Sequence, residues 1–371
     1  MNETSNQLTC SFCGGALTEE TAREFGGRIL CENCYESNTV VCARCGDRIW
    51  DSDSRGDEDT PLCIDCHDDH YTHCEDCDRL ISNEDAYYED DSSEYAYCER
   101  CYNRRINAPI KSYYYKPEPQ FYGSGDFFMG VELEIDNGGE CGENAEKILN
   151  IANANGERIY CKHDGSIQDG FEMVSHPMSL EYHTKHMNWK EVFDKAVDMG
   201  YRSHQTYTCG LHAHVSRNAL GNTYIEQEAT IARIIHFVEL HWNELLKFSR
   251  RTEESITRWA NRYGIAENTE ETYKKAKNRH LGRYVAVNLE NVNTVEFRMF
   301  KGTLRYETFI ATLQLIHEIC RLAISLEDKE MERLSWSDFV LMIDAKHQEL
   351  IDYLKTKRLY VNEIQSERED A

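Results

Sequence analysis

The chain has little positive charge for its length. Its 371 residues include 41 Lys and Arg side chains against 66 Asp and Glu, which gives a formal net charge of −25. So acidic a chain repels phosphate backbones, and nucleic-acid binding would require a concentrated basic patch, which the sequence lacks. The composition therefore argues against a DNA-binding or RNA-binding protein.

Long apolar runs are also missing. No stretch approaches 18 apolar residues, and residues 1–8 contain neither the basic nor the apolar part of a secretory signal. We therefore expect a cytoplasmic protein with no membrane partner. A chain of this length is long enough for two or three domains with sizeable cores.

Proline is scarce, and its placement suggests a domain boundary. Three of the five prolines (Pro109, Pro117 and Pro119) fall in residues 105–125, a segment that closes with Gly-Ser-Gly. Proline fixes its own backbone and lacks an N–H donor, so this segment cannot be a regular helix or a central strand. We interpret 105–125 as a linker between domains at 1–104 and 126–371.

Cysteine, in contrast, is abundant and ordered. Twelve of the sixteen cysteines form six Cys-x-x-Cys pairs before residue 102. These are Cys10/Cys13, Cys31/Cys34, Cys42/Cys45, Cys63/Cys66, Cys74/Cys77 and Cys98/Cys101. The remaining four, which we interpret as buried or free thiols, are Cys141, Cys161, Cys209 and Cys320.

The cysteine pairs repeat with a period of 32 residues, starting again at Cys10, Cys42 and Cys74. Two pairs about twenty residues apart supply four thiolates, enough for one closed tetrahedral zinc site, so the pattern predicts three structural Zn²⁺ ions rather than disulfides. Residues 8–104 resemble tandem zinc ribbons or LIM-like modules. Ligand pairing across neighbouring units stays open. Three nearby histidines could replace ligands, although we interpret them as solvated loop residues: His67, His70 and His73.

The charge of this segment indicates its role. Residues 1–104 carry 25 acidic and 8 basic side chains, a formal charge of −17 before any thiolate is counted. That sign is wrong for a zinc-based reader of DNA or RNA, and a closed zinc site has no open position for catalysis. We therefore expect a module that binds a protein partner or presents a substrate.

Beyond the linker, residues 130–135 (Gly-Val-Glu-Leu-Glu-Ile) alternate between aliphatic and acidic side chains. A strand's period of two puts Glu132 and Glu134 on one face and the aliphatic side chains on the other. Taken alone, this pattern also fits a strand with a solvated acidic face.

The same design recurs in three further predicted strands, at 170–177, 209–216 and 294–300. Their polar faces carry Glu172, then His212 and His214, then Glu296 and Arg298. Several carboxylates with imidazole and arginine suit Mg²⁺ or Mn²⁺ holding the phosphates of a nucleotide. Further strands are expected at 159–162 and 283–289, and helices at 143–155, 223–249, 306–326 and 335–355.

Five ordered motifs carry a resemblance to the amidoligase family of the glutamine synthetase and glutamate–cysteine ligase superfamily. They span about residues 127–310 and read GVELE (130–134), KHDGS (162–166), GFEMVSHP (170–177), CGLHAHV (209–215) and NL to TVEFRMF (288–300). The resemblance implies an α+β fold, in which an antiparallel sheet binds ATP and two or three divalent metals on a concave polar face. Helices are expected on the other face.

The resemblance also implies residue roles. Five residues fall at metal-ligand positions and, with the phosphate-contacting Arg298, form the predicted catalytic set: Glu132, Glu134, Glu172, His212 and Glu296. Four more are candidates for binding ATP: Arg283, His214, Lys162 and Asp164. Asp164-Gly165 fits a structural turn equally well. One further carboxylate for the first metal site is not located, and no Gly-rich phosphate loop is evident.

The implied reaction forms an amide or isopeptide bond. ATP phosphorylates a carboxylate, and an amine then attacks the acyl phosphate. The sequence leaves open whether the acid and the amine belong to small molecules, peptides, cell-wall precursors or a protein tail. Two other hypotheses stay open. One is a metal-dependent hydrolase that activates water with the His-x-His pair and carboxylates. The other is a zinc-scaffolded adaptor whose ligase fold is inactive.

Overall fold

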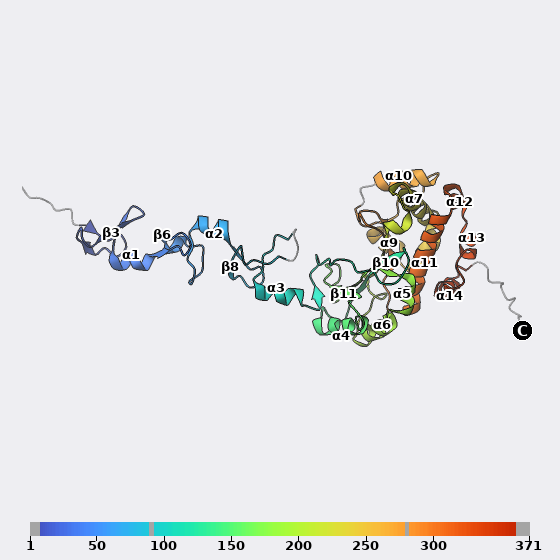
Figure 1. Cartoon of the computed structure of the whole chain (residues 1–371), viewed down its shortest axis with the longest axis horizontal. Helices are drawn as coiled ribbons and strands as arrows, with labels where there is room; N and C mark the ends of the chain where they lie inside the picture. The colour runs from blue at the N-terminus through green and yellow to red at the C-terminus, as the bar shows by residue number, and fades with distance from the viewer. Residues whose placement is uncertain (1–7, 89–92, 279–281, 361–371) are drawn as a thin grey trace, which may run out of the picture. The chain divides into compact units, whose positions relative to one another are not determined.

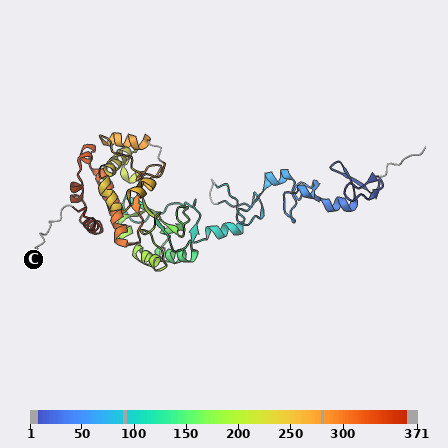
Figure 2. The same cartoon turned by 180° about the vertical axis from the view of Figure 1, so that it is seen from behind.

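The computed structural model describes residues 8–88, 93–278 and 282–360, which divide into two compact units at Asn107/Ala108. Figures 1 and 2 show the chain from opposite sides. The first unit holds the cysteine pairs and the second holds one large sheet with its helices. In the part of the chain that the structure describes, no helix is both long and apolar enough to cross a membrane.

The first unit consists of three successive modules, each with one or two short hairpins and a closing helix. The closing helices begin directly after Cys31, Cys63 and Cys98, which occupy their N-cap positions. The elements are β1 Leu8–Thr9, β2 Ala16–Leu17, β3 Ala22–Phe25, β4 Arg28–Cys31 and α1 Glu32–Asn38, then β5 Thr39–Val41, β6 Arg48–Trp50, η1 Asp51–Asp53 and α2 Ile64–His70, then β7 Tyr71–His73, β8 Leu80–Ser82 and α3 Glu99–Ile106.

The second unit is built on an eight-stranded sheet in which all pairings except the parallel β9–β11 pair are antiparallel. The strand order is β15-β16-β14-β10-β12-β11-β9, and β13 pairs with β10 beside this path. The strands are β9 Ile110–Lys111, β10 Phe128–Ile135, β11 Ile159–Lys162, β12 Phe171–Ser175, β13 Met178–Ser179, β14 Gly210–Ser216, β15 Val287–Asn288 and β16 Thr294–Lys301.

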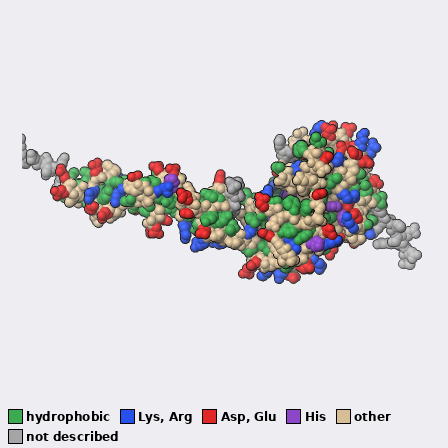
Figure 3. All heavy atoms as spheres, viewed as in Figure 1, with side chains coloured by type: hydrophobic (Ala, Val, Ile, Leu, Met, Phe, Trp, Pro, Cys, Tyr) green, Lys and Arg blue, Asp and Glu red, His purple; other side chains and the backbone are tan. Residues whose placement is uncertain are grey.

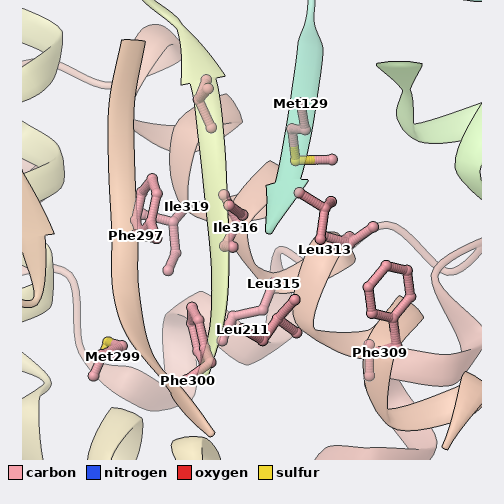
Figure 4. Close-up of a cluster of buried hydrophobic side chains, with 14 of the residues drawn as sticks. Met129, Leu211, Phe297, Met299, Phe300, Phe309, Leu313, Leu315, Ile316 and Ile319 are labelled. Atoms are coloured by element: carbon pink, nitrogen blue, oxygen red, sulfur yellow. The ribbon is translucent and has the colours of Figure 1, made fainter. Parts of the chain in front are cut away.

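One face of the sheet forms the core of this unit, because alternate side chains of the central strands are aliphatic or aromatic. Figure 4 shows Met129, Leu211 and Phe297 from three strands packed with Leu313 and Ile316 of the long helix α11. The helices of the unit are α4 Gly142–Ala152, α5 Leu180–Lys185, α6 Trp189–Asp198, η2 Arg217–Leu220, α7 Tyr224–Leu240, α8 Trp242–Ser249, α9 Glu253–Trp259, α10 Thr269–Asn278, α11 Tyr306–Ser325, α12 Asp328–Arg333, α13 Trp336–Leu341 and α14 Gln348–Thr356.

The predicted α+β class is confirmed: a large, mostly antiparallel sheet with helices follows three small four-cysteine modules. Several element boundaries differ from the sequence predictions. The helix expected at 223–249 is two helices, because the chain departs from helical geometry at His241. The helix expected at 335–355 is interrupted between α13 and α14, and the strand expected at 283–289 shortens to Val287–Asn288. The sequence predictions followed the spacing of hydrophobic residues, and that spacing does not mark the turns that interrupt or shorten these elements.

The predicted linker divides between the two units: residues 105–107 belong to the first unit, where α3 ends at Ile106, and residues 108–125 belong to the second. Its residues Ile110–Lys111 form β9 at the edge of the sheet, and the Tyr115 ring lies 5.3 Å from the Tyr160 ring, centre to centre. The Tyr113 hydroxyl lies 3.1 Å from a guanidinium nitrogen of Arg283. The sequence left open which unit these tyrosines contact, and the packing of the linker decides it.

Candidate functional site

The six cysteine pairs form three tetra-cysteine clusters, and each cluster uses the two pairs of one repeat. The clusters are Cys10/Cys13/Cys31/Cys34, Cys42/Cys45/Cys63/Cys66 and Cys74/Cys77/Cys98/Cys101. Pairing is therefore sequential rather than between neighbouring units. The three nearby histidines lie outside the clusters; for example, His67 Nδ1 contacts Asp68 at 2.9 Å.

The cluster geometry fits zinc. In tetrahedral coordination, Zn–S bonds of about 2.3 Å place sulfur atoms about 3.8 Å apart. The distance from Cys13 Sγ to Cys31 Sγ is 3.8 Å, and the corresponding distances in the second and third modules are 3.9 Å and 3.8 Å. Backbone N–H groups of the first cluster, above all that of Cys13, lower the pKa of Cys10 to about 6, which favours the thiolate. The geometry of the three clusters is consistent with three structural zinc ions.

The local sequence explains why the same turn follows the first cysteine pair of each module. Gly14, Gly46 and Asp78 occupy the same position in the three modules, with φ of 73°, 79° and 56°. This left-handed conformation lets each N–H donate back to the carbonyl of the first cysteine, at 2.8–3.0 Å. The residue before each second pair is buried, with Leu30 and Leu62 fully covered. Because these small modules have few other core side chains, zinc must supply much of their folding free energy.

Cys45→Ser is expected to remove one of three structural zinc ions and to unfold the second module, because three thiolates and a hydroxyl close the site poorly. Zinc content by mass spectrometry and hydrogen exchange of residues 39–71 measure the effect. Cys141→Ser is the matched control, since Cys141 belongs to the second unit and lies outside the three clusters. Unchanged zinc content in Cys45→Ser would contradict the assigned ligand.

In the second unit, strand register brings the predicted residues together on the polar face of the sheet. Glu132 on β10 lies opposite His212 on β14, and His214 lies opposite Glu296 on β16. The pairing of β14 with β16 shifts register between Leu211 and Ala213, around His212. The polar face is therefore continuous across three neighbouring strands.

The centre of this face is a carboxylate–imidazole cluster. His214 Nε2 lies 3.3 Å from Glu132 Oε1 and 3.8 Å from Glu296 Oε1, and His212 Nδ1 lies 3.4 Å from Glu132 Oε2. Burial disfavours the Glu132 carboxylate, but the two imidazoles outweigh burial and hold the pKa of Glu132 well below its usual range. Burial likewise disfavours the charged imidazole of His214, yet Glu132 and Glu296 raise its pKa.

Glu296 is held on both sides. Its Oε2 accepts a hydrogen bond from Asn288 Nδ2 at 2.9 Å, and its Oε1 contacts a guanidinium nitrogen of Arg298. The Arg298 Nε is buried without a hydrogen-bond partner among the described residues. Sequence reasoning missed Asn288 as a site residue, although its place in the predicted strand next to the Glu296 strand was a usable signal.

Glu134 and Glu172 extend the acidic face toward β12, where they lie opposite each other in register. The Gly210 N–H donates to Glu134 Oε2 at 2.6 Å, and Lys162 Nζ lies 3.3 Å from Glu172 Oε2. Burial raises the pKa of Glu134, and burial together with the Glu132 charge raises the pKa of Glu172 well above its usual range. These carboxyls are neutral more readily than Glu132.

Gly210 packs closely against two side chains of the polar face. A Cβ at this position would approach His212 Nε2 to 2.7 Å and a guanidinium nitrogen of Arg251 to 3.0 Å. Arg251 is buried, and burial lowers its pKa to about 10 despite the Glu134 charge. The sequence analysis missed Arg251, because it follows a helix in a segment with no strand alternation.

Two of the residues predicted to bind ATP do not belong to the carboxylate–imidazole cluster, although the charge of Asp164 acts on Glu134 and Glu172. Arg283 is exposed in a turn, where its guanidinium contacts the Tyr113 hydroxyl; Tyr113 in turn lies under Lys162, with the Lys162 Nζ 5.8 Å from the ring centre. Asp164 accepts hydrogen bonds from Ser166, at 2.7 Å to the backbone N–H, as expected for a structural turn. Tyr113, another residue that sequence reasoning missed, thus links Arg283 to the polar face.

The residues present fit a divalent metal ion. Glu132, His212 and Glu296 each offer one ligand atom, and the three atoms lie within 4.8 Å of one another. His214 Nε2 is buried next to them without a well-aligned hydrogen-bond partner among the described residues. Carboxylate oxygens with imidazole suit Mn²⁺, and the carboxylates suit Mg²⁺.

The chain matches no protein-family model and no curated protein sequence. The fold and the two kinds of cluster therefore define its class by themselves. It is an α+β protein in which three zinc-binding modules precede a mostly antiparallel sheet with an acidic, histidine-containing polar face.

The paired charges of Glu132 and His214 predict a pH-dependent stability. The pKa of His214 is higher in the folded protein than in the unfolded chain. The stabilisation of the fold by charged His214 is therefore fully present below the unfolded pKa of about 6.5 and is lost as pH rises through the folded pKa. Without added Mg²⁺ or Mn²⁺, we expect the second unit of the wild-type protein to have a Tm about 2–4 °C higher at low pH than that of His214→Gln. Calorimetry between about pH 6 and pH 9 tests this. A Tm difference that grows with pH would contradict the assigned pair.

Proposed function

We propose that the second unit is an ATP-dependent carboxylate–amine ligase that forms an amide bond. One observation carries the proposal. The metal-type ligands Glu132, His212 and Glu296 meet within 4.8 Å on the polar face, next to an arginine with an unpartnered buried donor, Arg298 Nε. The resemblance of five ordered motifs to the amidoligase family supports the same assignment.

The proposed roles follow from position and charge. Glu132, His212 and Glu296 hold Mg²⁺ or Mn²⁺, and Glu134 and Glu172 extend the ligand set toward β12. When bound, the metals offset the charge of the nucleotide phosphates. Four carboxylates, those of Glu132, Glu134, Glu172 and Glu296, share this face with Lys162, Arg251 and Arg298, and bound metal ions would add the positive charge that nucleotide phosphates require.

Arg298 and Lys162 are proposed to contact phosphate oxygens. Arg298 already bonds to Glu296 through one nitrogen, so its orientation is fixed before substrate arrives. Its side chain is only 12% exposed, and a charge placed against it is weakly screened by water. Such a preorganised guanidinium stabilises negative charge as the phosphoryl group moves.

The proposed reaction has two steps. The substrate carboxylate attacks the γ-phosphorus of ATP, which releases ADP and gives an acyl phosphate. The substrate amine then attacks the acyl carbon and phosphate leaves, with loss of one proton from the amine nitrogen. Tyr113 and Tyr115 of the linker lie over β11 beside the polar face, with Tyr115 against Tyr160. We infer that these rings help to exclude water, which would otherwise hydrolyse the intermediate.

The zinc unit is proposed to bind a protein partner or to present a substrate. Figure 3 shows Asp and Glu side chains spread over the visible face of its modules. Apolar side chains are exposed as well, including Val41 at 45% and Ile64 at 51%. Acidic surroundings with exposed apolar groups suit a basic, partly apolar protein segment. Tight binding of duplex DNA at physiological salt would overturn this assignment.

The decisive experiment incubates the full chain with Mg-ATP, fractionated lysate and hydroxylamine, and identifies the hydroxamate by mass. A ligase gives ADP and hydroxamate in equal amounts, and both depend on the carboxylate fraction. Loss of substrate without ATP would favour the hydrolase hypothesis. Failure to bind Mg-ATP under any condition would favour the adaptor hypothesis.

A further inference from the structure

A second cluster of ligand-type side chains lies where α14 packs on α11, away from the polar face. His317 and Glu318 belong to α11, and His347 immediately precedes α14. Figure 4 shows neighbouring residues Ile316 and Ile319 among the core side chains, and α11 and α14 lie side by side in Figures 1 and 2. Glu318 is fully buried and His347 is 3% exposed.

The Glu318 carboxylate is oriented by an arginine. Arg321 donates to its Oε2 from two nitrogens, at 2.8 and 2.6 Å, and donates also to the Met342 carbonyl at 2.7 Å. This arrangement turns Glu318 Oε1 toward His347, whose Nδ1 lies 2.7 Å away. One carboxylate oxygen is thus committed to Arg321, and the other faces the two imidazoles.

Four polar atoms of the cluster are buried without a well-aligned hydrogen-bond partner among the described residues. They are Glu318 Oε1, His317 Nδ1 and both ring nitrogens of His347. Buried polar groups in native proteins are nearly always satisfied, because an unsatisfied one costs free energy. A charged His347 paired with Glu318 would satisfy two of these atoms and leave His317 Nδ1 and a second His347 nitrogen without partners.

We propose that His317, Glu318 and His347 bind one transition-metal ion of the zinc class. One ligand atom from each residue lies within 4.8 Å of the other two. Two imidazoles and one carboxylate are a zinc ligand set that leaves one coordination position open. Arg321 holds the carboxylate in place, as the residues behind metal ligands commonly do. The ion ties the start of α14 to α11, the helix that packs under the sheet.

Zinc binding by full-length wild-type protein, His347→Gln and Glu318→Gln tests the proposal. Each variant is expected to bind one zinc ion fewer than wild type when saturated with Zn²⁺ and freed of excess metal. The difference is the readout, because the three cysteine clusters and the polar face can also take zinc and are the same in all three proteins. With Co²⁺, the lost absorption is expected to lack the intense sulfur charge-transfer bands of the cysteine clusters.

His241→Gln is the matched control, since His241 is also buried but its Nε2 lies 2.9 Å from the Leu334 carbonyl oxygen. It is expected to keep the wild-type zinc content. Added Zn²⁺ should also raise the Tm of the second unit in wild type and His241→Gln, but not in the two cluster variants. Equal zinc content in wild type and a folded Glu318→Gln protein would overturn the proposal.

Discussion

If the second unit is the proposed ligase, Glu296→Gln is expected to abolish amide formation, with a loss of at least about 10³-fold in kcat, equivalent to about 4 kcal/mol of transition-state stabilisation. The change keeps the size of the side chain and the acceptor for Asn288 but removes the charge that faces His212, His214 and Arg298. Glu132→Gln should have a similar effect, because Glu132 faces the same two imidazoles from β10. Steady-state ADP and amide formation measure both.

The control is Glu290→Gln, an exposed neighbour in the turn before β16, which should keep wild-type activity. Zinc content and the far-ultraviolet circular dichroism of Glu296→Gln should match wild type, since the cysteine clusters lie in the other unit. Binding of Mn²⁺ at the polar face, measured by electron paramagnetic resonance, should weaken. Retained ligation in both Gln variants would refute the assigned metal ligands.

Arg298→Lys is expected to lower kcat by about 10²-fold to 10³-fold while the KM for ATP rises less. Lysine keeps the positive charge but loses the planar fork that lets one guanidinium bond to Glu296 and still offer other donors. In the proposed reaction the lost contact is to the moving phosphoryl group more than to bound ATP, so the transition state is expected to be affected most. Single-turnover phosphate release separates this step from substrate binding.

Arg258→Lys is the matched control, because Arg258 is exposed on α9 and its guanidinium stacks on Trp259. It should leave both kcat and KM unchanged. If Arg298→Lys keeps wild-type kcat, Arg298 does not stabilise the transferred phosphoryl group, although the metal assignment at Glu296 would stand independently. A rise in KM alone would place Arg298 in ground-state ATP binding.

The zinc modules were largely readable from the sequence, because spacing within a short segment decides which cysteines can meet. The period of 32 residues and the six Cys-x-x-Cys pairs predicted three tetrahedral zinc sites. The sequence left open whether Cys13 pairs with Cys31 or with a cysteine of another unit. In the structure, Cys31 is the N-cap of α1, and its sulfur lies 3.8 Å from that of Cys13.

The polar face was readable in part. Alternation placed Glu132 and Glu134 on one face, and the structure adds the register that sets Glu132 opposite His212. Arg283 was predicted on a strand, but the pairing of β15 covers only Val287–Asn288, and Arg283 lies in a turn against Tyr113. Register and strand length depend on partners far along the chain, which a local pattern does not contain.

The sequence by itself indicated the number of four-cysteine modules and the shared face of Glu132 and Glu134, which depend on cysteine spacing and on a period of two residues, both local properties. The α+β class was an expectation from the motif resemblance, and the sheet and helices of the structure confirm it. Only the tertiary structure decided which residues meet. It placed Asn288 against Glu296, packed the linker tyrosines on the second unit and brought His347 to Glu318. Those contacts join residues whose proximity is set by strand pairing and helix packing, and no repeat in the sequence encodes them.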